Sequence, residues 1–304
     1  MMLVVLLYAL FGFTFTLGKL MVVQAKPLFA VGLRMLSGGT ILLAWAFTRT
    51  NPRCAPQKND FPFYLQLTIF SAFLPYILRL WALQEVTVAK ASLLFNTTPF
   101  FTAIFGYFFL KERLSLVQFM GLCIGFFGTI PILLTSSPIE DTLSWSFISI
   151  YELAIIVAAA SMSYGFIVTQ KLVKHRKCPA FLANGIATFS AGCISLGASR
   201  VFEENPIKTS LTAFLSIMAI QLVISNLICS NLQASLFKKY SPTFISLAGF
   251  LSPLFAGLYG FLLFHEKITW HFCASFITTL AGIALYVWGT RSQKKDISKL
   301  EIPL

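Results

Sequence analysis

The feature of this sequence that most constrains its fold is a series of ten apolar runs, each about as long as a lipid bilayer is thick. A helix needs about 20 mostly apolar residues to cross the hydrocarbon core of a bilayer. The runs lie near residues 3–23, 28–48, 63–84, 87–110, 116–135, 147–170, 179–199, 211–236, 242–264 and 270–289. They predict an all-α integral membrane protein with ten transmembrane helices.

The composition supports a membrane protein and argues against nucleic-acid binding. The chain is 57% hydrophobic and 11% charged, and it contains 32 phenylalanines, whereas soluble domains are about 25% charged. The formal net charge is +12, but the Lys and Arg residues gather in short clusters between the apolar runs, as membrane-flanking charge does. The lipid bilayer is therefore the expected partner, and no nucleic acid is expected.

The distribution of these cations predicts the orientation of a multi-pass protein. With both termini in the cytoplasm, 15 of the 23 Lys and Arg residues lie inside and six lie outside. This bias agrees with the excess of positive charge in cytoplasmic loops. The connecting loop 136–146 has two acidic residues and no basic one, which is consistent with an outside position. We expect the membrane to be the bacterial cytoplasmic (inner) membrane.

Motifs for metal, cofactor or nucleotide chemistry are absent from the sequence. The six cysteines form no CxxC pair, and the three histidines form no HxxxH or HExxH spacing, so no metal site is predicted. No GxxxxGK[ST] loop is present, which argues against ATP hydrolysis by this chain. We therefore expect a transporter without a cofactor rather than an enzyme.

The chain repeats itself at an offset of 154 residues. The segment 92–115 aligns without gaps on 246–269, with identical Pro99/Pro253, Gly106/Gly260 and Glu112/Glu266 pairs. Each half holds five predicted helices, an odd number, so the second half enters the bilayer from the opposite side. This is a 5+5 inverted-topology repeat, an architecture typical of secondary transporters. The predicted units are a first repeat at 1–135, a connecting loop at 136–146, a second repeat at 147–289 and a cytoplasmic tail at 290–304.

These features make the sequence similar to the drug/metabolite transporter superfamily, and specifically to its EamA-type members with ten helices. The matching features are Pro99 and Pro253, the turns Lys111–Ser115 and His265–Thr269, the glycines Gly121, Gly125, Gly128 and Gly282, and Lys19, Pro27 and Arg34. His265 departs from the basic residue expected there. The resemblance implies a central cavity between the halves and transport of amino acids, nucleoside-like metabolites, drugs or S-adenosylmethionine.

The repeat also predicts which polar residues face that cavity. A charge in hydrocarbon costs about 3 kcal/mol or more, so such residues usually face a cavity or a partner. The offset pairs Arg79 with Gln233, Tyr76 with Ser230 and Ala72 with Asn226. Within each half these positions share one helical face. They predict two related polar stripes against the cavity, although Asn226 and Gln233 are also residue types that hold helices together.

Further candidates carry alternative interpretations. Asn96 precedes Pro99 by three residues, and we expect it to contact substrate, while Pro99 and Pro253 are candidates for helix kinks or a gate. Glu152 is a candidate substrate or proton residue, unless it is solvated at the membrane interface. Arg34 is equally compatible with a structural ion pair and with a cavity position.

The sequence thus predicts a secondary transporter, an exchanger or facilitator, for a small zwitterionic metabolite such as an amino acid or S-adenosylmethionine. The guanidinium of Arg79 matches a carboxylate, and aromatic rings match a cationic or apolar part. The alternative is a membrane channel or an exporter of drug-like or nucleoside-like metabolites. We expect a monomer or a homodimer.

Overall fold

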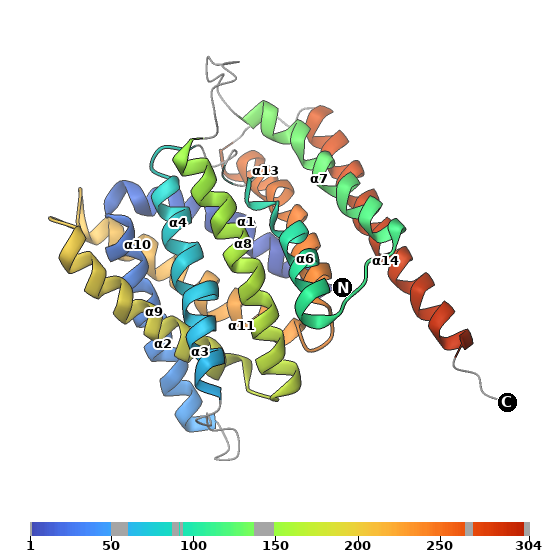
Figure 1. The fold of residues 1–304 in the computed structure, drawn as a ribbon. Helices are drawn as coiled ribbons and strands as arrows, with labels where there is room; N and C mark the ends of the chain where they lie inside the picture. The colour runs from blue at the N-terminus through green and yellow to red at the C-terminus, as the bar shows by residue number, and fades with distance from the viewer. Residues whose placement is uncertain are drawn as a thin grey trace.

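The computed structural model describes residues 2–49, 60–86, 91, 94–136, 149–264 and 270–300, and they are helical almost throughout (Figure 1). The first half contains α1 (Met2–Gln24), α2 (Pro27–Arg49), α3 (Phe61–Leu67), η3 (Thr68–Phe73), α4 (Leu74–Ala82), α6 (Thr98–Leu110) and α7 (Leu116–Ser136). The second half contains α8 (Ile150–Gln170), η4 (Lys171–His175), α9 (Ala180–Phe202), α10 (Leu211–Gln221), η5 (Leu222–Cys229), α11 (Ser230–Leu236), α12 (Pro242–Leu247), η6 (Ala248–Phe250), α13 (Leu251–Phe264) and α14 (Trp270–Leu300).

Apolar helices account for all ten predicted segments. Within the described residues, seven are long and apolar enough to cross a membrane, namely Met2–Gln24, Pro27–Thr48, Phe61–Ala82, Ile150–Lys174, Ala180–Phe202, Leu211–Leu236 and Cys273–Thr290. Three shorter apolar helices, Thr98–Leu110, Leu116–Thr129 and Pro242–Phe255, fall in the remaining segments. The all-helical membrane fold is thus confirmed.

The internal repeat is visible in the element order. Adding 154 to the bounds of α2 and α6 places them on α9 and α13 to within one residue, and adding 154 to the first residue of α7 gives the first residue of α14. The match extends to irregular structure, because the π-helical segments η3 and η5 both interrupt the third helix of their half, at residues 68–73 and 222–229. Such a shared irregularity argues that the two halves have the same backbone path.

Twin helices of the two halves pack directly against each other and run antiparallel. Along α7 and α14, Gln118 contacts Thr290, Gly121 is next to Tyr286, and Gly128 is next to Thr278. Residue numbers therefore rise along one helix as they fall along the other. Figure 1 shows α7 (green) beside α14 (red) at one edge of the molecule.

The α2–α9 pair repeats this arrangement. Gly32 is next to Leu196, Gly39 is next to Phe189, and Gly185 is next to Leu42. An axis that relates two antiparallel twins lies perpendicular to them, which for spanning helices means within the membrane plane. The 5+5 inverted topology follows from this geometry.

The fourth and ninth segments are broken rather than continuous. Asn96 and Thr97 form a turn before α6, and Pro99 is the second residue of that helix. The ninth segment is divided into α12, the 3-10 turn η6 and α13, with Pro253 the third residue of α13. Both prolines thus occupy a first helical turn, where their missing N–H has no intrahelical partner to lose.

The tenth helix is longer than predicted. We expected it to end near residue 289 and to be followed by a polar tail, but α14 continues to Leu300. The residues 290–300 contain no Pro or Gly, so nothing in this stretch breaks the helix. The connecting loop after Ser136 and the turn His265–Thr269 lie outside the described residues.

Candidate substrate cavity

A cavity lies between the two halves, at the level where the third, fourth, eighth and ninth segments change direction. Its lining comes from both repeats, with Tyr76, Arg79 and Asn96 from the first and Ser230 and Gln233 from the second. The cavity volume is about 100 Å³, whereas sites for drug-sized ligands have roughly 300–1,000 Å³. A solute of nucleoside size therefore requires the walls of this cavity to move apart.

The lining follows the internal repeat. Six pairs of lining residues are separated by the repeat offset of 154, namely Tyr8/Met162, Ser71/Ser225, Tyr76/Ser230, Arg79/Gln233, Phe95/Gly249 and Thr98/Ser252. The two repeats therefore contribute equivalent backbone positions to the cavity, but the side chains at these positions differ in chemistry. The first half places a cation and a phenol where the second half places an amide and a hydroxyl.

Arg79 is the only charged residue among the described residues that line the cavity. It lies in the last turn of α4 and is 7% exposed. Its guanidinium carbon is 5.1 Å from the centroid of the Tyr76 ring and 5.7 Å from that of Phe95. Aromatic faces hold a guanidinium through its charge while leaving its edge donors for other groups. The site thus holds a positive charge in a largely apolar wall.

Neutral polar groups also line the cavity. Asn96 is buried, and its Nδ2 has no hydrogen-bond partner among the described residues. Thr98 is the first residue of α6 and Ser252 is the second residue of α13, so the first turns of both helices line the cavity. Because a helix N-terminus carries a partial positive charge, this arrangement adds to the preference for a negative group.

Aromatic rings form another part of the lining. Phe166 and Phe237 lie with their ring centroids 5.3 Å apart, and Tyr8 and Phe11 lie 5.9 Å apart. The Tyr8 hydroxyl donates to the carbonyl of Ile245, which joins α1 to α12. The cavity lining therefore combines a cation, amides and aromatic rings, a set of groups that suits a solute with a carboxylate and an apolar or cationic part.

The predicted site residues divide into two groups. Arg79, Tyr76, Asn96, Ser230, Gln233 and Pro99 line the cavity. Asn226 does not, because its buried side chain points to α2 and donates from Nδ2 to Met35 Sδ at 3.1 Å. Pro253 is next to the lining residue Ser252 but is not itself part of the lining.

Glu152 caps the start of α8. It is the third residue of α8 and forms a capping box with Ser149, in which the Ser149 backbone N–H donates to the Glu152 carboxylate at 2.9 Å. The sequence carried this signal, because a serine followed three residues later by glutamate marks a helix start. Its carboxylate satisfies the first turn of α8 and does not line the cavity.

Several lining residues were missed by sequence reasoning. Ser71 and Ser225, at matched positions of η3 and η5, both line the cavity, as do Thr98 and Ser252. The pairing of hydroxyl residues at the repeat offset was visible in the sequence. Nothing in the sequence indicated that the backbone is π-helical there, which changes the face that these hydroxyls occupy.

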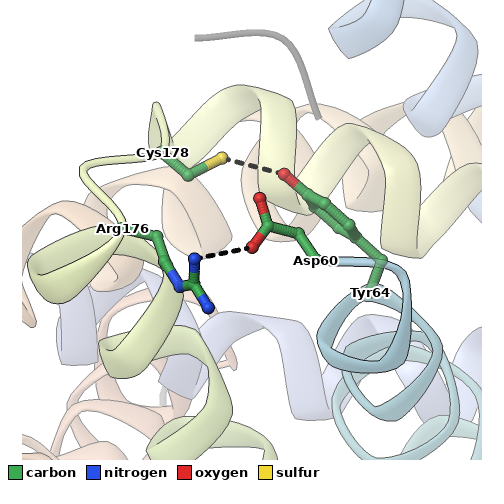
Figure 2. Close-up of polar contacts among 4 residues, drawn as sticks. All are labelled: Asp60, Tyr64, Arg176 and Cys178. Carbon is green, nitrogen blue, oxygen red and sulfur yellow. Dashed lines mark hydrogen bonds and ion pairs between the residues drawn. The ribbon is translucent and has the colours of Figure 1, made fainter. Parts of the chain in front are cut away.

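One end of the bundle is closed by polar contacts between the halves (Figure 2). Arg176, after η4, forms an ion pair with Asp60 at 3.5 Å, and the Tyr64 hydroxyl lies 3.2 Å from Cys178 Sγ. These contacts join the start of the third segment to the α8–α9 connection. We call these four residues the latch.

The other end is closed by backbone pairing. The α1–α2 connection pairs with the α9–α10 connection through an antiparallel bridge between Ala25 and Ile207. Lys26 N donates to Pro206 O at 2.8 Å, and Lys208 N donates to Gln24 O at 2.8 Å. At each end of the bundle, a segment of one repeat thus contacts a segment of the other.

Comparison with known proteins places this geometry among transporters. A model of the EamA-like transporter family matches residues 1–134 and 149–288. The "S-adenosylmethionine/S-adenosylhomocysteine transporter" of Chlamydia muridarum (strain MoPn / Nigg) is 31% identical over 265 residues, covering 84% of this chain and 80% of that protein. The "Probable amino-acid metabolite efflux pump" of Escherichia coli (strain K12) is 24% identical over 212 residues, covering 67% of this chain and 69% of the pump.

A solved crystal structure has the same fold. It superposes with a TM-score of 0.74 at 16% sequence identity, and the match covers 95% of this chain and 96% of the other.

Proposed function

The chain belongs to the EamA-like transporter family of the drug/metabolite transporter superfamily, and we propose that it exchanges or facilitates the passage of a small zwitterionic metabolite by alternating access. An amino acid or S-adenosylmethionine has the required chemistry. The observation that carries this proposal is a cavity whose described lining holds one cation, Arg79, and no carboxylate.

The carboxylate of the solute is assigned to Arg79. A guanidinium can donate two parallel hydrogen bonds to a carboxylate, and this geometry is both stronger and more specific than a neutral contact. Asn96 and Gln233 supply amide groups on the same cavity surface. These amides fit the ammonium group and other polar atoms of the solute.

The remainder of the solute is assigned to the aromatic part of the lining. Phe166, Phe237 and Tyr8 offer ring faces to an apolar side chain, a nucleobase or a sulfonium. Sulfonium and ammonium groups are attracted to aromatic faces. Similarity to a protein named as a transporter of S-adenosylmethionine and S-adenosylhomocysteine supports this choice.

Exchange or facilitated passage is favoured over proton coupling. Proton-coupled carriers normally use carboxylates or histidines at membrane depth. The described lining contains neither, and Glu152, the candidate proton residue, caps a helix instead. We place both termini in the cytoplasm of a bacterium, which puts the latch on the cytoplasmic side.

Counterflow in proteoliposomes tests this proposal. Liposomes loaded with S-adenosylhomocysteine are expected to accelerate uptake of external S-adenosylmethionine, whereas a pH gradient alone has no effect. Arg79→Ala is expected to abolish saturable uptake. Stimulation by a pH gradient without stimulation by internal solute would contradict exchange, and unchanged affinity of the Arg79→Ala variant for every amino-acid-like solute would contradict the site.

Export is the second candidate direction. The similarity to the probable amino-acid metabolite efflux pump favours it for amino-acid-like solutes. Cells that express the chain would then retain less labelled amino acid than cells that express the Arg79→Ala variant.

A further inference from the structure

Arg34 is a buried arginine without a hydrogen-bond partner. It lies in α2, its side chain has 0% exposure, and Nε, Nη1 and Nη2 all lack a partner among the described residues. The structural ion pair that the sequence allowed is therefore absent from the described part of the chain. Its guanidinium carbon lies 5.0 Å from the centroid of the Tyr76 ring, whose face carries partial negative charge.

A buried guanidinium without hydrogen-bond partners lowers the free energy of unfolding. Removing a guanidinium from water without an anion or acceptors carries a large desolvation penalty, of which a cation–π contact returns only a part. An apolar residue of similar volume would be more favourable for folding at this position. Buried charges of this kind in membrane proteins mark functional sites.

The position of Arg34 connects it to the cavity. Tyr76 lines the cavity, and its ring is contacted both by Arg34 and by Arg79, whose guanidinium carbon lies 5.1 Å from the same centroid. One turn along α2, Gly38 adjoins Asn226, whose buried Oδ1 also has no hydrogen-bond partner among the described residues. Beside Tyr76, then, lies a second polar region with unused donors and an unused acceptor.

We propose that Arg34 is a second anion-binding residue of the transport site, reached when the Tyr76 ring turns aside. This inference rests on the proposed function. A carboxylate has about four acceptor positions, so it can accept hydrogen bonds from two guanidinium groups at once. The solute would supply the negative charge that the described residues do not provide to Arg34, and Tyr76 would cover both cations in the empty carrier.

The test uses purified protein with S-adenosylhomocysteine and its methyl ester, which lacks the negative charge. The wild type is expected to bind the acid about tenfold or more tightly than the ester. Arg34→Met is expected to reduce this ratio severalfold and, in the absence of ligand, to raise the melting temperature. Arg34→Lys keeps the charge without the planar fork and is expected to retain part of the ratio.

The control is Leu42→Met, a volume-conserving change at another fully buried position of α2, which is expected to leave the ratio unchanged. A lower melting temperature for both Arg34 variants, together with an unchanged acid-to-ester ratio, would overturn the inference and make Arg34 structural. If the wild type itself binds acid and ester equally, the carboxylate site of the proposed function fails. If the wild type prefers the acid and the Arg34 variants keep the same preference, the carboxylate site of the proposed function stands and only the second anion position is wrong.

Discussion

At the residue scale, Glu112 illustrates how a carboxylate joins the two halves next to the membrane. It follows α6, its backbone N–H donates to Gly106 O at 3.1 Å, and its carboxylate accepts from Thr243 Oγ1 of α12 at 3.3 Å. Burial raises the pKa of Glu112 above its ordinary value, while Thr243 and Lys174 act in the opposite direction. The carboxyl is therefore easier to protonate in the folded protein than in the unfolded chain.

The raised pKa of Glu112 gives a pH-dependent stability. Between the ordinary glutamate pKa of about 4.3 and the raised folded value, the folded state binds more protons than the unfolded state. The free energy of unfolding must then fall as the pH rises through this window. Thermal melts of the wild type and of Glu112→Gln should converge at low pH and diverge as the pH rises, with the wild type losing stability.

The exposed Glu85 provides the control for this experiment. Glu85→Gln should follow the wild-type curve. A Glu112→Gln curve parallel to the wild type at every pH would mean that the Glu112 carboxyl does not carry the effect.

At the element scale, glycine contacts fix how closely the twin helices approach. A Cβ on Gly192 of α9 would lie 2.3 Å from Leu36 N of α2, and a Cβ on Gly282 of α14 would lie 2.4 Å from Gly125 N of α7. No side chain fits at either place without separating the helices. Small residues at such crossings allow the close packing that holds helices together in lipid.

We therefore predict opposite effects for two alanine substitutions in α9. Gly192→Ala should destabilise the protein by about 1–3 kcal/mol through overpacking, seen as a lower melting temperature in detergent. Gly197→Ala is the matched control, because a Cβ there meets nothing within 4 Å. It should be neutral or stabilising by about 0.5–1 kcal/mol, and equal melting temperatures for the two variants would contradict the packing.

The latch gives a prediction about local opening. Asp60→Asn removes an ion pair in which the Arg176 side chain is 48% exposed, so it should change stability by less than about 1 kcal/mol. It should nevertheless expose Cys178, which is 6% exposed and contacts Tyr64. In a background with the other cysteines replaced by alanine, the variant should react faster with a thiol reagent.

The comparison for the latch is Asp60→Asn against the same background with Asp60 intact. Equal labelling rates at Cys178 would show that the ion pair does not hold this end closed.

The sequence predicted the positions of the transmembrane helices better than the irregular segments within them. Hydropathy located the ten apolar segments because lipid exposure requires long apolar runs, and the repeat followed from matched prolines and glycines. Arg79 stood out because a cation within an apolar run is energetically anomalous. Pro99 and Pro253 marked the positions of the breaks before α6 and α13, whereas the π-helical η3 and η5 left no periodic signal in the sequence. The cavity-facing hydroxyls of Ser71 and Ser225 were missed for that reason.

At the scale of the whole molecule, the two repeats share one backbone arrangement in opposite orientations, and their different side chains make the protein asymmetric. Different contacts join the two repeats at the two ends of the bundle, the latch at one end and the Ala25–Ile207 bridge at the other. Because each contact joins the two repeats, a relative rotation of the halves can open one end while the other stays closed. Such a rotation is the movement that the proposed alternating access requires.

The most direct test of this account is a cross-link at the backbone-paired end. Residues facing each other in an antiparallel bridge have Cα atoms about 4.5–5.5 Å apart, which is within the range of a disulfide. In a background whose native cysteines are replaced, Ala25→Cys with Ile207→Cys should therefore form a disulfide that locks this end closed. The account predicts that oxidation stops S-adenosylmethionine counterflow and that reduction restores it. Counterflow that continues at the same rate in the fully cross-linked protein would contradict alternating access between the two halves.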